Sequence, residues 1–390
     1  MHREITSLFA QNKVVLRETK RAVTPYGGLA VFVEYLRKIG YSDAIRKFIP
    51  VQMTSPNAID PAETFTAFLV SVLSGARRFA HAGLLRVDKA MHCLLGIARF
   101  PTDDTIRNLF KRFNQAKVSE FYSSLTQWQV QRLPERSEGY SLDLDSTIFE
   151  RYGRQQGALK GYNPKKRGRP SHHPLLAVMA EVHFVLHAWL RSGNCSSSRG
   201  VVEFLKEALA ILARVHKIRV VRADSGFFDD KFLSFLEEQN LPYIVVARLT
   251  RWIKSEAVNI CEWKDLDSIY SVAEFSKKLH GWNRERRIVD FCLKEFFATE
   301  AVFQAILLLF NLLSEFQRAS GMPGYRQPAA LRTQVFLCGA ILGRAGRKQV
   351  LHMSSSWGGL ETRNPLFEKI LAYVFPTSPK LDFSLQTSCP

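Results

Sequence analysis

The sequence predicts a mixed α/β core preceded by a helical N-terminal region, and three observations lead to this fold class. Residues 1–136 contain periodic apolar segments separated by short polar breaks, a pattern typical of amphipathic helices. From residue 137 onwards, short apolar runs alternate with helical segments, which is typical of a sheet with crossover helices. Of the 390 residues, 46% are hydrophobic, which is enough to form the cores of two or three domains.

Within the N-terminal region, one segment has the features of a helix that contacts DNA. Polar residues at 102–104 predict a helix N-terminus. The apolar residues that follow have the i, i+3, i+4, i+7 spacing of one buried face: Ile106, Leu109, Phe110 and Phe113. Arg107 and Lys111 then lie on the exposed side, where a DNA-contacting helix needs them, although an ordinary solvated charged face has the same pattern. We therefore expect residues 1–136 to form an all-α DNA-binding region.

The segments of the core follow in an order that predicts a mixed sheet. An alternating apolar and acidic run at 140–149 predicts a strand. Residues 174–190 favour a hairpin of two strands, although their length also allows one helix. The sequence then predicts a helix at 201–215, a strand at 217–223, a helix at 229–239 and a strand at 242–247. A long helix that is apolar on most of its faces, and therefore buried, is expected at about 291–318.

Composition indicates where the core domain ends. Residues 251–290 are irregular and rich in Trp, Lys and Arg. After a Gly- and Pro-containing break near residue 320, residues 324–353 contain five Arg and Lys residues and no acid. We expect a core domain at 137–320 and a small basic C-terminal module with a loosely ordered tail at 321–390.

Several classes of protein are excluded by composition. The longest uninterrupted apolar run, at 305–310, is far shorter than the ~20 residues of a membrane-spanning helix. The N-terminus lacks the apolar stretch of a secretory signal. The six cysteines are widely spaced and include no Cys-x-x-Cys pair, so neither a disulfide scaffold nor a zinc site is expected. These features predict a soluble cytoplasmic protein that does not bind membranes.

The charge balance predicts a polyanionic partner. Lys and Arg number 54 and Asp and Glu number 36, which gives a net charge of +18, although an ordinary basic enzyme has the same balance. Residues 151–169 contain seven cations, four glycines and no acid. Such a loop suits contact with a nucleic-acid backbone, and the alternative is a flexible surface hairpin. The predicted DNA-contacting residues of this loop are Arg151, Arg154, Lys160, Lys165, Lys166, Arg167 and Arg169.

Acidic residues lie where two of the predicted strands end. Asp143 and Asp145 alternate with leucines, so both lie on one face of their strand, and Asp224 follows the strand at 217–223. Carboxylates on adjacent strands are the ligands that hold two hard cations about 4 Å apart in phosphodiester chemistry. The alternative is that these residues cap or turn the chain at strand ends. The histidines at 172, 173, 183 and 187 are expected to pack or to contact DNA rather than to bind a metal.

Five blocks of sequence resemble one known family. They are LDLDST at 142–147, GALKGYNPKKRGRPSHHPLLA at 157–177, LRSGN at 190–194, VRADSGF at 221–227 and FFATEAVFQAILLLFNLLSEFQRA at 296–319. These blocks are similar to bacterial insertion-sequence transposases with a DDE catalytic domain of the ribonuclease-H-like fold. The resemblance implies cleavage at element ends and strand transfer into target DNA with two Mg²⁺ or Mn²⁺ ions. It also implies a homodimer that binds the terminal inverted repeats, in the nucleoid of a bacterial cytoplasm.

The resemblance also assigns roles to single residues. Asp145 matches the first catalytic aspartate, with Asp143 as the fallback for that role, and Asp224 matches the second. The resemblance implies that Asp145 and Asp224 both bind metal. The third acid is a glutamate, which the family carries after an insertion that is reduced here to residues 251–290. Glu285 is the best substitute, followed by Glu295 and Glu300.

The shortened insertion predicts weak or absent activity, because an incomplete set of carboxylates binds metal poorly. Two other functions remain open from the sequence. One is a non-catalytic DNA-binding remnant that represses transposition by occupying the terminal repeats. The other is a metal-dependent nuclease that cuts DNA without joining it.

Overall fold

The computed structural model describes residues 3–10, 12–163, 166–212, 215–246, 264–265, 271–272, 294–355 and 360–374. Two of the predicted site residues, Lys165 and Glu285, lie outside the described residues, as does nearly all of the predicted reduced insertion at 251–290.

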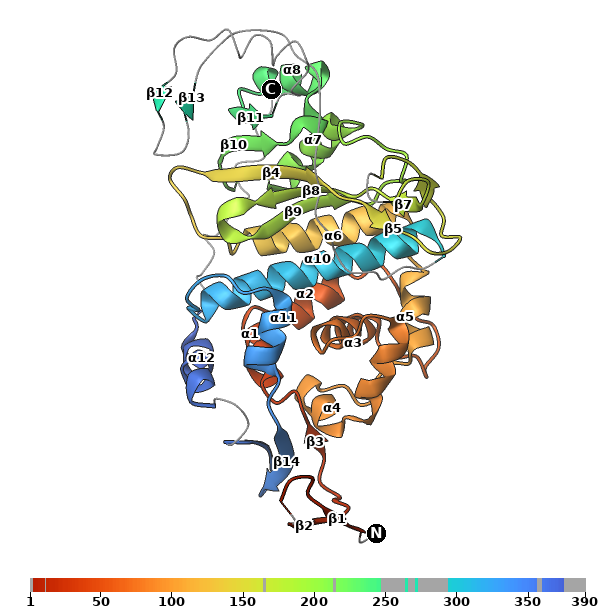
Figure 1. Ribbon diagram of the computed structural model, residues 1–390, viewed down its shortest axis with the longest axis vertical. Coiled ribbons are helices and arrows are strands. Elements are labelled where there is room, and N and C mark those ends of the chain that lie inside the picture. Colours follow the sequence, from red (N-terminus) through yellow and green to blue (C-terminus); the bar gives the residue numbers. More distant parts are fainter. Residues whose placement is uncertain are drawn as a thin grey trace.

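A five-stranded mixed sheet forms the upper layer of the molecule (Figure 1), with the strand order β11-β10-β4-β8-β9. Its strands are β4 (Tyr140–Ser146), β8 (Leu175–Met179), β9 (Phe184–Trp189), β10 (Ile218–Ala223) and β11 (Tyr243–Val245). β4 lies at the centre, parallel to β10 and antiparallel to β8. The predicted hairpin at 174–190 is confirmed, because β8 and β9 are antiparallel neighbours. They are joined by the short helical turn η2 (Ala180–Val182).

Two crossover helices return the chain to this sheet. α7 (Val201–Leu212) connects β9 to β10, and α8 (Asp230–Glu238) connects β10 to β11. Apolar residues of both helices share one core with the sheet, including Phe204 and Phe232, which are fully buried. The carboxylate of Asp229 accepts hydrogen bonds from backbone N–H groups in the first turn of α8, which accounts for where this helix begins. The predicted helices at 201–215 and 229–239 are therefore confirmed.

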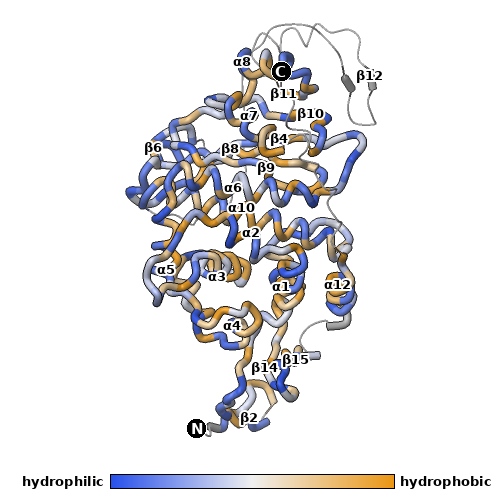
Figure 2. The backbone as a smooth tube through the Cα atoms, turned by 180° about the vertical axis from the view of Figure 1, so that it is seen from behind, coloured by the Kyte–Doolittle hydropathy of each residue, from blue (hydrophilic) through white to orange (hydrophobic). Residues whose placement is uncertain are grey.

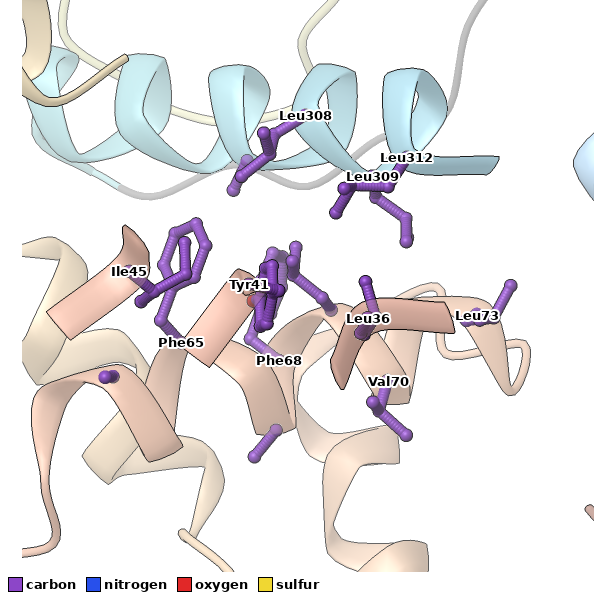
Figure 3. Close-up of a cluster of buried hydrophobic side chains, with 14 of the residues drawn as sticks. Leu36, Tyr41, Ile45, Phe65, Phe68, Val70, Leu73, Leu308, Leu309 and Leu312 are labelled. Atoms are coloured by element: carbon purple, nitrogen blue, oxygen red, sulfur yellow. The ribbon is translucent and has the colours of Figure 1, made fainter. Parts of the chain in front are cut away.

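The long helix α10 (Phe296–Ala319) runs through the middle of the molecule, between the sheet and the N-terminal helices (Figure 1). Phe303 and Leu307 pack in one cluster with residues of β8 and β9. Leu308, Leu309 and Leu312 point to the other side, toward Phe65 and Phe68 (Figure 3). By length and composition alone α10 could span a membrane, with a mean hydropathy of 1.8, but 72% of that window is buried inside the protein. Burial on two sides accounts for its apolar character.

The N-terminal layer contains most of the helices. They are α1 (Leu29–Lys38), α2 (Tyr41–Phe48), α3 (Pro61–Leu73), the 3₁₀ segment η1 (Phe79–Val87), α4 (Lys89–Leu95), α5 (Asp103–Phe110) and α6 (Gln115–Val130). An all-α region is not confirmed, because three short strands precede them: β1 (Arg3–Thr6), β2 (Lys13–Leu16) and β3 (Val23–Thr24). β3 pairs with β14 (Ala340–Ala345). A pairing between segments so distant in the chain leaves no local periodicity for sequence reasoning to detect.

The segment after α10 packs on the N-terminal helices. It consists of α11 (Pro328–Leu331), a π-helical turn (Arg332–Phe336), β14, β15 (Lys348–Met353) and α12 (Leu360–Ala372). Leu331, Phe336 and Ile370 are buried in the same core as α1 and α3. Besides the antiparallel pair β1–β2, two further small sheets lie in the described part of the chain. One consists of β5 (Phe149–Glu150), β6 (Leu159–Lys160) and β7 (Pro170–His172), and the other of β12 (Lys264–Asp265) and β13 (Ser271–Val272).

Candidate active site

Asp145 and Asp224 lie at the ends of neighbouring parallel strands. The register of β4 and β10 pairs Asp143 with Arg222 and ends at Leu144 and Ala223. Asp145 and Asp224 are each the next residue along, so the two carboxylates leave the sheet at the same edge. The predicted alternation in β4 is confirmed, because Leu142 and Leu144 are buried while Asp145 is exposed.

The third aspartate of this edge, Asp143, is held by an ion pair. The Nε of Arg222 donates to its Oδ1 at 2.6 Å, and Nη2 donates to its Oδ2 at 2.8 Å. This two-pronged contact follows from the register, which places Asp143 and Arg222 directly opposite each other. Both oxygens of Asp143 are therefore occupied, and Asp145 is the better candidate for a metal ligand.

Each candidate carboxylate is oriented by a backbone N–H group close to it in the chain. The N–H of Ser146 donates to Oδ1 of Asp145 at 2.7 Å. The N–H of Gly226 donates to Oδ1 of Asp224 at 2.8 Å, at the start of the short helical turn η3 (Ser225–Phe227). The pKa of Asp145 is raised, chiefly by loss of hydration at the strand end; the hydrogen bond from Ser146 opposes this shift, and the charges of Asp224 and Asp143 add to it. A divalent cation would relieve this repulsion, so the donor set fits a hard cation.

The loop at 191–200 lies against both strand ends, and sequence reasoning assigned it no role. The hydroxyl oxygens of Ser146 and Ser197 are 2.7 Å apart. A Cβ atom placed on Gly226 would lie 2.8 Å from Oγ of Ser197 and 3.0 Å from Oδ1 of Asp224. The only feature of the sequence that pointed to this loop was the LRSGN block at 190–194. That block resembles the family, but it does not indicate which residues the loop contacts.

The two described candidates for the third catalytic acid, Glu295 and Glu300, have partners in other parts of the protein. Glu295 precedes the first turn of α10, where its carboxylate is 3.8 Å from Nζ of Lys111. Glu300 is buried, and one of its oxygens accepts a hydrogen bond from the N–H of Leu190 at 3.2 Å. It lines a cavity of about 50 Å³ between α6, α7, β9 and α10, away from the ends of β4 and β10. Among the described residues, no group of three or more His, Cys, Asp and Glu side chains is arranged to hold a metal ion.

Comparison with known proteins identifies the family. The family model for the transposase DDE domain, group 1, matches residues 6–296, which is most of the chain. The protein belongs to this transposase family. No curated protein matches the sequence.

Solved structures of other transposases are similar at low identity. The piggyBac transposase, seen by cryo-electron microscopy in a synaptic complex with hairpin DNA, has a TM-score of 0.38 and 11% identity. That match covers 82% of this chain and 83% of the other. The Mos1 transposase in a paired-end complex with the left transposon end has a TM-score of 0.21 and 9% identity, over 50% and 61% of the two chains.

In this transposase-family chain, the basic loop at 151–169 is anchored by one of its own arginines. Arg151 is buried, and its Nε donates to Nδ1 of His172 at 3.0 Å. The guanidinium therefore packs inside the loop and not on its surface, where a DNA contact would need it. Burial lowers the pKa of His172 to about 4, and the Arg151 charge acts in the same direction. Nε2 of His172 bonds to the backbone carbonyl of Gln156 at 3.0 Å, which ties the loop down from a second side.

Most of the other described cations of the basic loop lie at its surface. Arg154, Lys160 and Arg167 are exposed. Lys166 is exposed as well, but its Nζ is 2.9 Å from a carboxylate oxygen of Glu150. The guanidinium of Arg169 stacks over the ring of Tyr152 at 4.5 Å. The chain around β6 is mostly hydrophilic (Figure 2).

The predicted DNA-contacting helix corresponds to α5. Its apolar face is confirmed, since Ile106, Leu109 and Phe110 are buried. Arg107, however, bonds to Asp103 and Asp104 in the first turn of its own helix, both at 2.8 Å. Its guanidinium also lies over the ring of Phe79. Lys111 ends the helix beside Glu295, so both predicted contacts already have partners within the protein.

Proposed function

We propose that the protein is a DNA transposase of the ribonuclease-H-like DDE kind, with Asp145 and Asp224 as its catalytic carboxylates. The observation that carries this proposal is the pair of aspartates at adjacent parallel strand ends in a chain of the transposase DDE family. The strand order and the crossover helices support the ribonuclease-H-like assignment. The substrates in this proposal are double-stranded element ends and target DNA.

Asp145 and Asp224 would hold Mg²⁺ or Mn²⁺ through the oxygens that their backbone hydrogen bonds leave available. Two such ions supply an activated water and stabilise the leaving oxygen in phosphodiester chemistry. The residues of the chain orient the carboxylates: the N–H groups of Ser146 and Gly226 each fix one Oδ1. The ion pair of Asp143 with Arg222 keeps that third charge out of the metal site.

We further propose that catalysis is weak. A complete set of ligands requires a third carboxylate, and neither Glu295 nor Glu300 lies beside the two aspartates. Glu285 remains the proposed third residue, and it lies outside the described part of the chain. With one carboxylate displaced or missing, metal affinity and rate fall by orders of magnitude.

DNA binding in this proposal relies on the exposed cations of the basic loop rather than on α5. Arg154, Lys160 and Arg167 are exposed on the loop that follows the first catalytic strand. Such contacts fix the position of a DNA backbone without reading its sequence. Pairing of two element ends by a homodimer, in the bacterial nucleoid, completes the proposal.

A cleavage and strand-transfer assay with purified protein, end DNA and Mn²⁺ tests this function. We expect slow cleavage by the native protein and none by Asp145→Asn or Asp224→Asn. Asp143→Asn is the matched control on the same strand face, and it should retain the native rate within a few-fold because Asp143 is occupied by Arg222.

Three outcomes would change the proposal. Specific binding to end DNA without any metal-dependent cutting would favour a repressor that occupies the ends. Cutting without joining would identify a nuclease. Rapid cleavage that depends on Asp145 would support the assignment as a transposase but contradict the proposal that its catalysis is weak.

A further inference from the structure

One residue, Ser197, contacts both of the groups that orient the catalytic carboxylates. The backbone N–H of Ser146 holds Asp145, and the hydroxyl of the same Ser146 lies 2.7 Å from Oγ of Ser197. The backbone N–H of Gly226 holds Asp224, and the space where a Cβ of Gly226 would lie is filled by Oγ and Cβ of Ser197, at 2.8 and 3.0 Å. Ser197 therefore bridges the two strand ends at the level of the carboxylates.

The hydroxyl of Ser197 takes part in a hydrogen-bonded chain with Ser146 and His173. Nδ1 of His173 lies 2.6 Å from the carbonyl oxygen of Cys195, which only accepts, so Nδ1 donates. Nε2 of the same ring lies 3.2 Å from the hydroxyl of Ser146. The hydroxyls of Ser146 and Ser197 share a hydrogen bond of 2.7 Å. His173 is buried, so its end of this chain is held in place.

A buried arginine holds the backbone of the loop that carries Ser197. Arg191 is 7% exposed, and its Nε donates to the carbonyl of His173 at 3.1 Å. Its Nη1 donates to three carbonyls of the loop, those of Ser196 at 3.1 Å, Ser197 at 3.4 Å and Arg199 at 2.8 Å. Burial lowers the pKa of Arg191 to about 10, so this charge is kept inside the protein at a cost in hydration. The guanidinium carries five N–H donors in a rigid, planar fork, which suits it to hold several carbonyls in a fixed arrangement.

We propose that Ser197 is a positioning residue of the active site, held by Arg191 and His173, that sets the placement of Asp145 relative to Asp224. This inference rests on the proposed function, because it assigns the residue that prepares the two carboxylates for their metal ions. Partners that orient metal ligands commonly account for about 10- to 100-fold of metal affinity. The contribution of Ser197 acts on the geometry of the ligands and not on the overall stability of the fold.

Mn²⁺ binding by the purified full-length protein, measured by titration calorimetry, tests the inference without relying on turnover. Ser197→Ala should weaken Mn²⁺ binding by about 10- to 100-fold. Its thermal unfolding midpoint and its affinity for end DNA without metal should stay close to the native values. Ser196→Ala is the matched control, since Ser196 is exposed on the same loop and should bind Mn²⁺ as the native protein does.

A second variant disturbs the same contact from the opposite strand. Gly226→Ala places a Cβ against Oγ of Ser197, so it should also weaken Mn²⁺ binding. Because the new Cβ crowds Oγ of Ser197 as well as Oδ1 of Asp224, removal of the Ser197 hydroxyl should relieve part of the strain, and the double variant should lose less affinity than the sum of the two single losses. Additive losses would contradict a shared role.

The outcomes separate this inference from the proposed function. Native Mn²⁺ binding that Asp145→Asn abolishes and Ser197→Ala leaves unchanged would overturn the positioning role alone. A native protein that binds no Mn²⁺ would overturn the proposed function and, with it, this inference.

Discussion

At the scale of single residues, the aspartates of β4 differ in role because their neighbours differ. Asp143 and Asp145 are the same type of residue and lie on the same face of β4. Only Asp143 has Arg222 directly opposite it, and this arginine neutralises its charge. Asp145 lies one residue beyond the last position of β4 that pairs with β10, and its exposed carboxylate has a raised pKa. Cross-strand register therefore separates a structural acid from a catalytic candidate.

Glu300 provides a residue-scale prediction about stability and pH. Burial raises its pKa to about 7 from an ordinary value of 4.5. Between these two pH values the folded protein keeps a proton that the unfolded chain releases, so this residue lowers stability as the pH rises from about 4.5 to 7. Glu300→Gln removes the charge and keeps an acceptor for the N–H of Leu190. We expect the variant to be more stable than the native protein by about 1–3 kcal/mol at pH 8.

Urea unfolding at two pH values checks this expectation. At pH 4.5 the native carboxyl is protonated in the fold, so the two proteins should differ little. An equal gain at both pH values would show that the substitution acts through packing and not through the charge.

At the scale of elements, α10 is the helix that joins the two layers. One side packs on β8 and β9, and the opposite side packs on the N-terminal helices (Figure 3). The same helix presents Glu300 to the N–H of Leu190, the residue that precedes the loop carrying Ser197. Because α10 lies between the layers, its apolar residues determine how both are held together.

The burial of α10 gives an element-scale prediction. Leu312 is fully buried, so Leu312→Ala should reduce the free energy of unfolding by about 2–5 kcal/mol, through lost burial and the cavity left behind. Leu371→Ala is the matched control, because Leu371 in α12 is 62% exposed and should cost less than about 0.5 kcal/mol. Chemical denaturation of the two variants measures both effects. Equal losses would contradict the assigned packing of α10.

At the scale of the whole molecule, the proposed DNA binding depends on where the positive charge lies. The net charge of +18 is spread over many elements, but the exposed cations of the basic loop stand on the segment that follows β4. β14 and β15 carry another basic group at the other end of the molecule (Figure 1). Ion pairs with DNA phosphates release counterions, so each lost contact is visible in the salt dependence of binding.

The salt dependence of DNA binding gives the whole-molecule prediction. Replacing Arg154, Lys160 and Arg167 together by alanine should make the slope of log K against log [salt] shallower by about 2–3, close to one unit for each phosphate contact. The control removes the same charge from three exposed lysines on α2, α4 and α7: Lys47, Lys89 and Lys206. Fluorescence anisotropy over a series of salt concentrations measures both. An equal change in both triple variants would show that only net charge matters.

Local sequence patterns determined a large part of this structure. The alternation at 140–146 and the apolar spacing at 106, 109 and 110 led to β4 and to the buried face of α5, because periodicity records which side chains meet the core. The blocks around Asp145 and Asp224 also led to the family, and the match over residues 6–296 confirms it.

Tertiary structure alone decided which groups become neighbours. The pairing of β3 with β14, the ion pair of Asp143, the burial of Arg151 and the placement of Ser197 between two strand ends all join segments distant in the chain. No local pattern records such contacts, because they depend on strand register and on how the layers pack. The sequence by itself therefore determined the elements and the chemistry that their residues carry. Only the fold decided which residues meet to form a site.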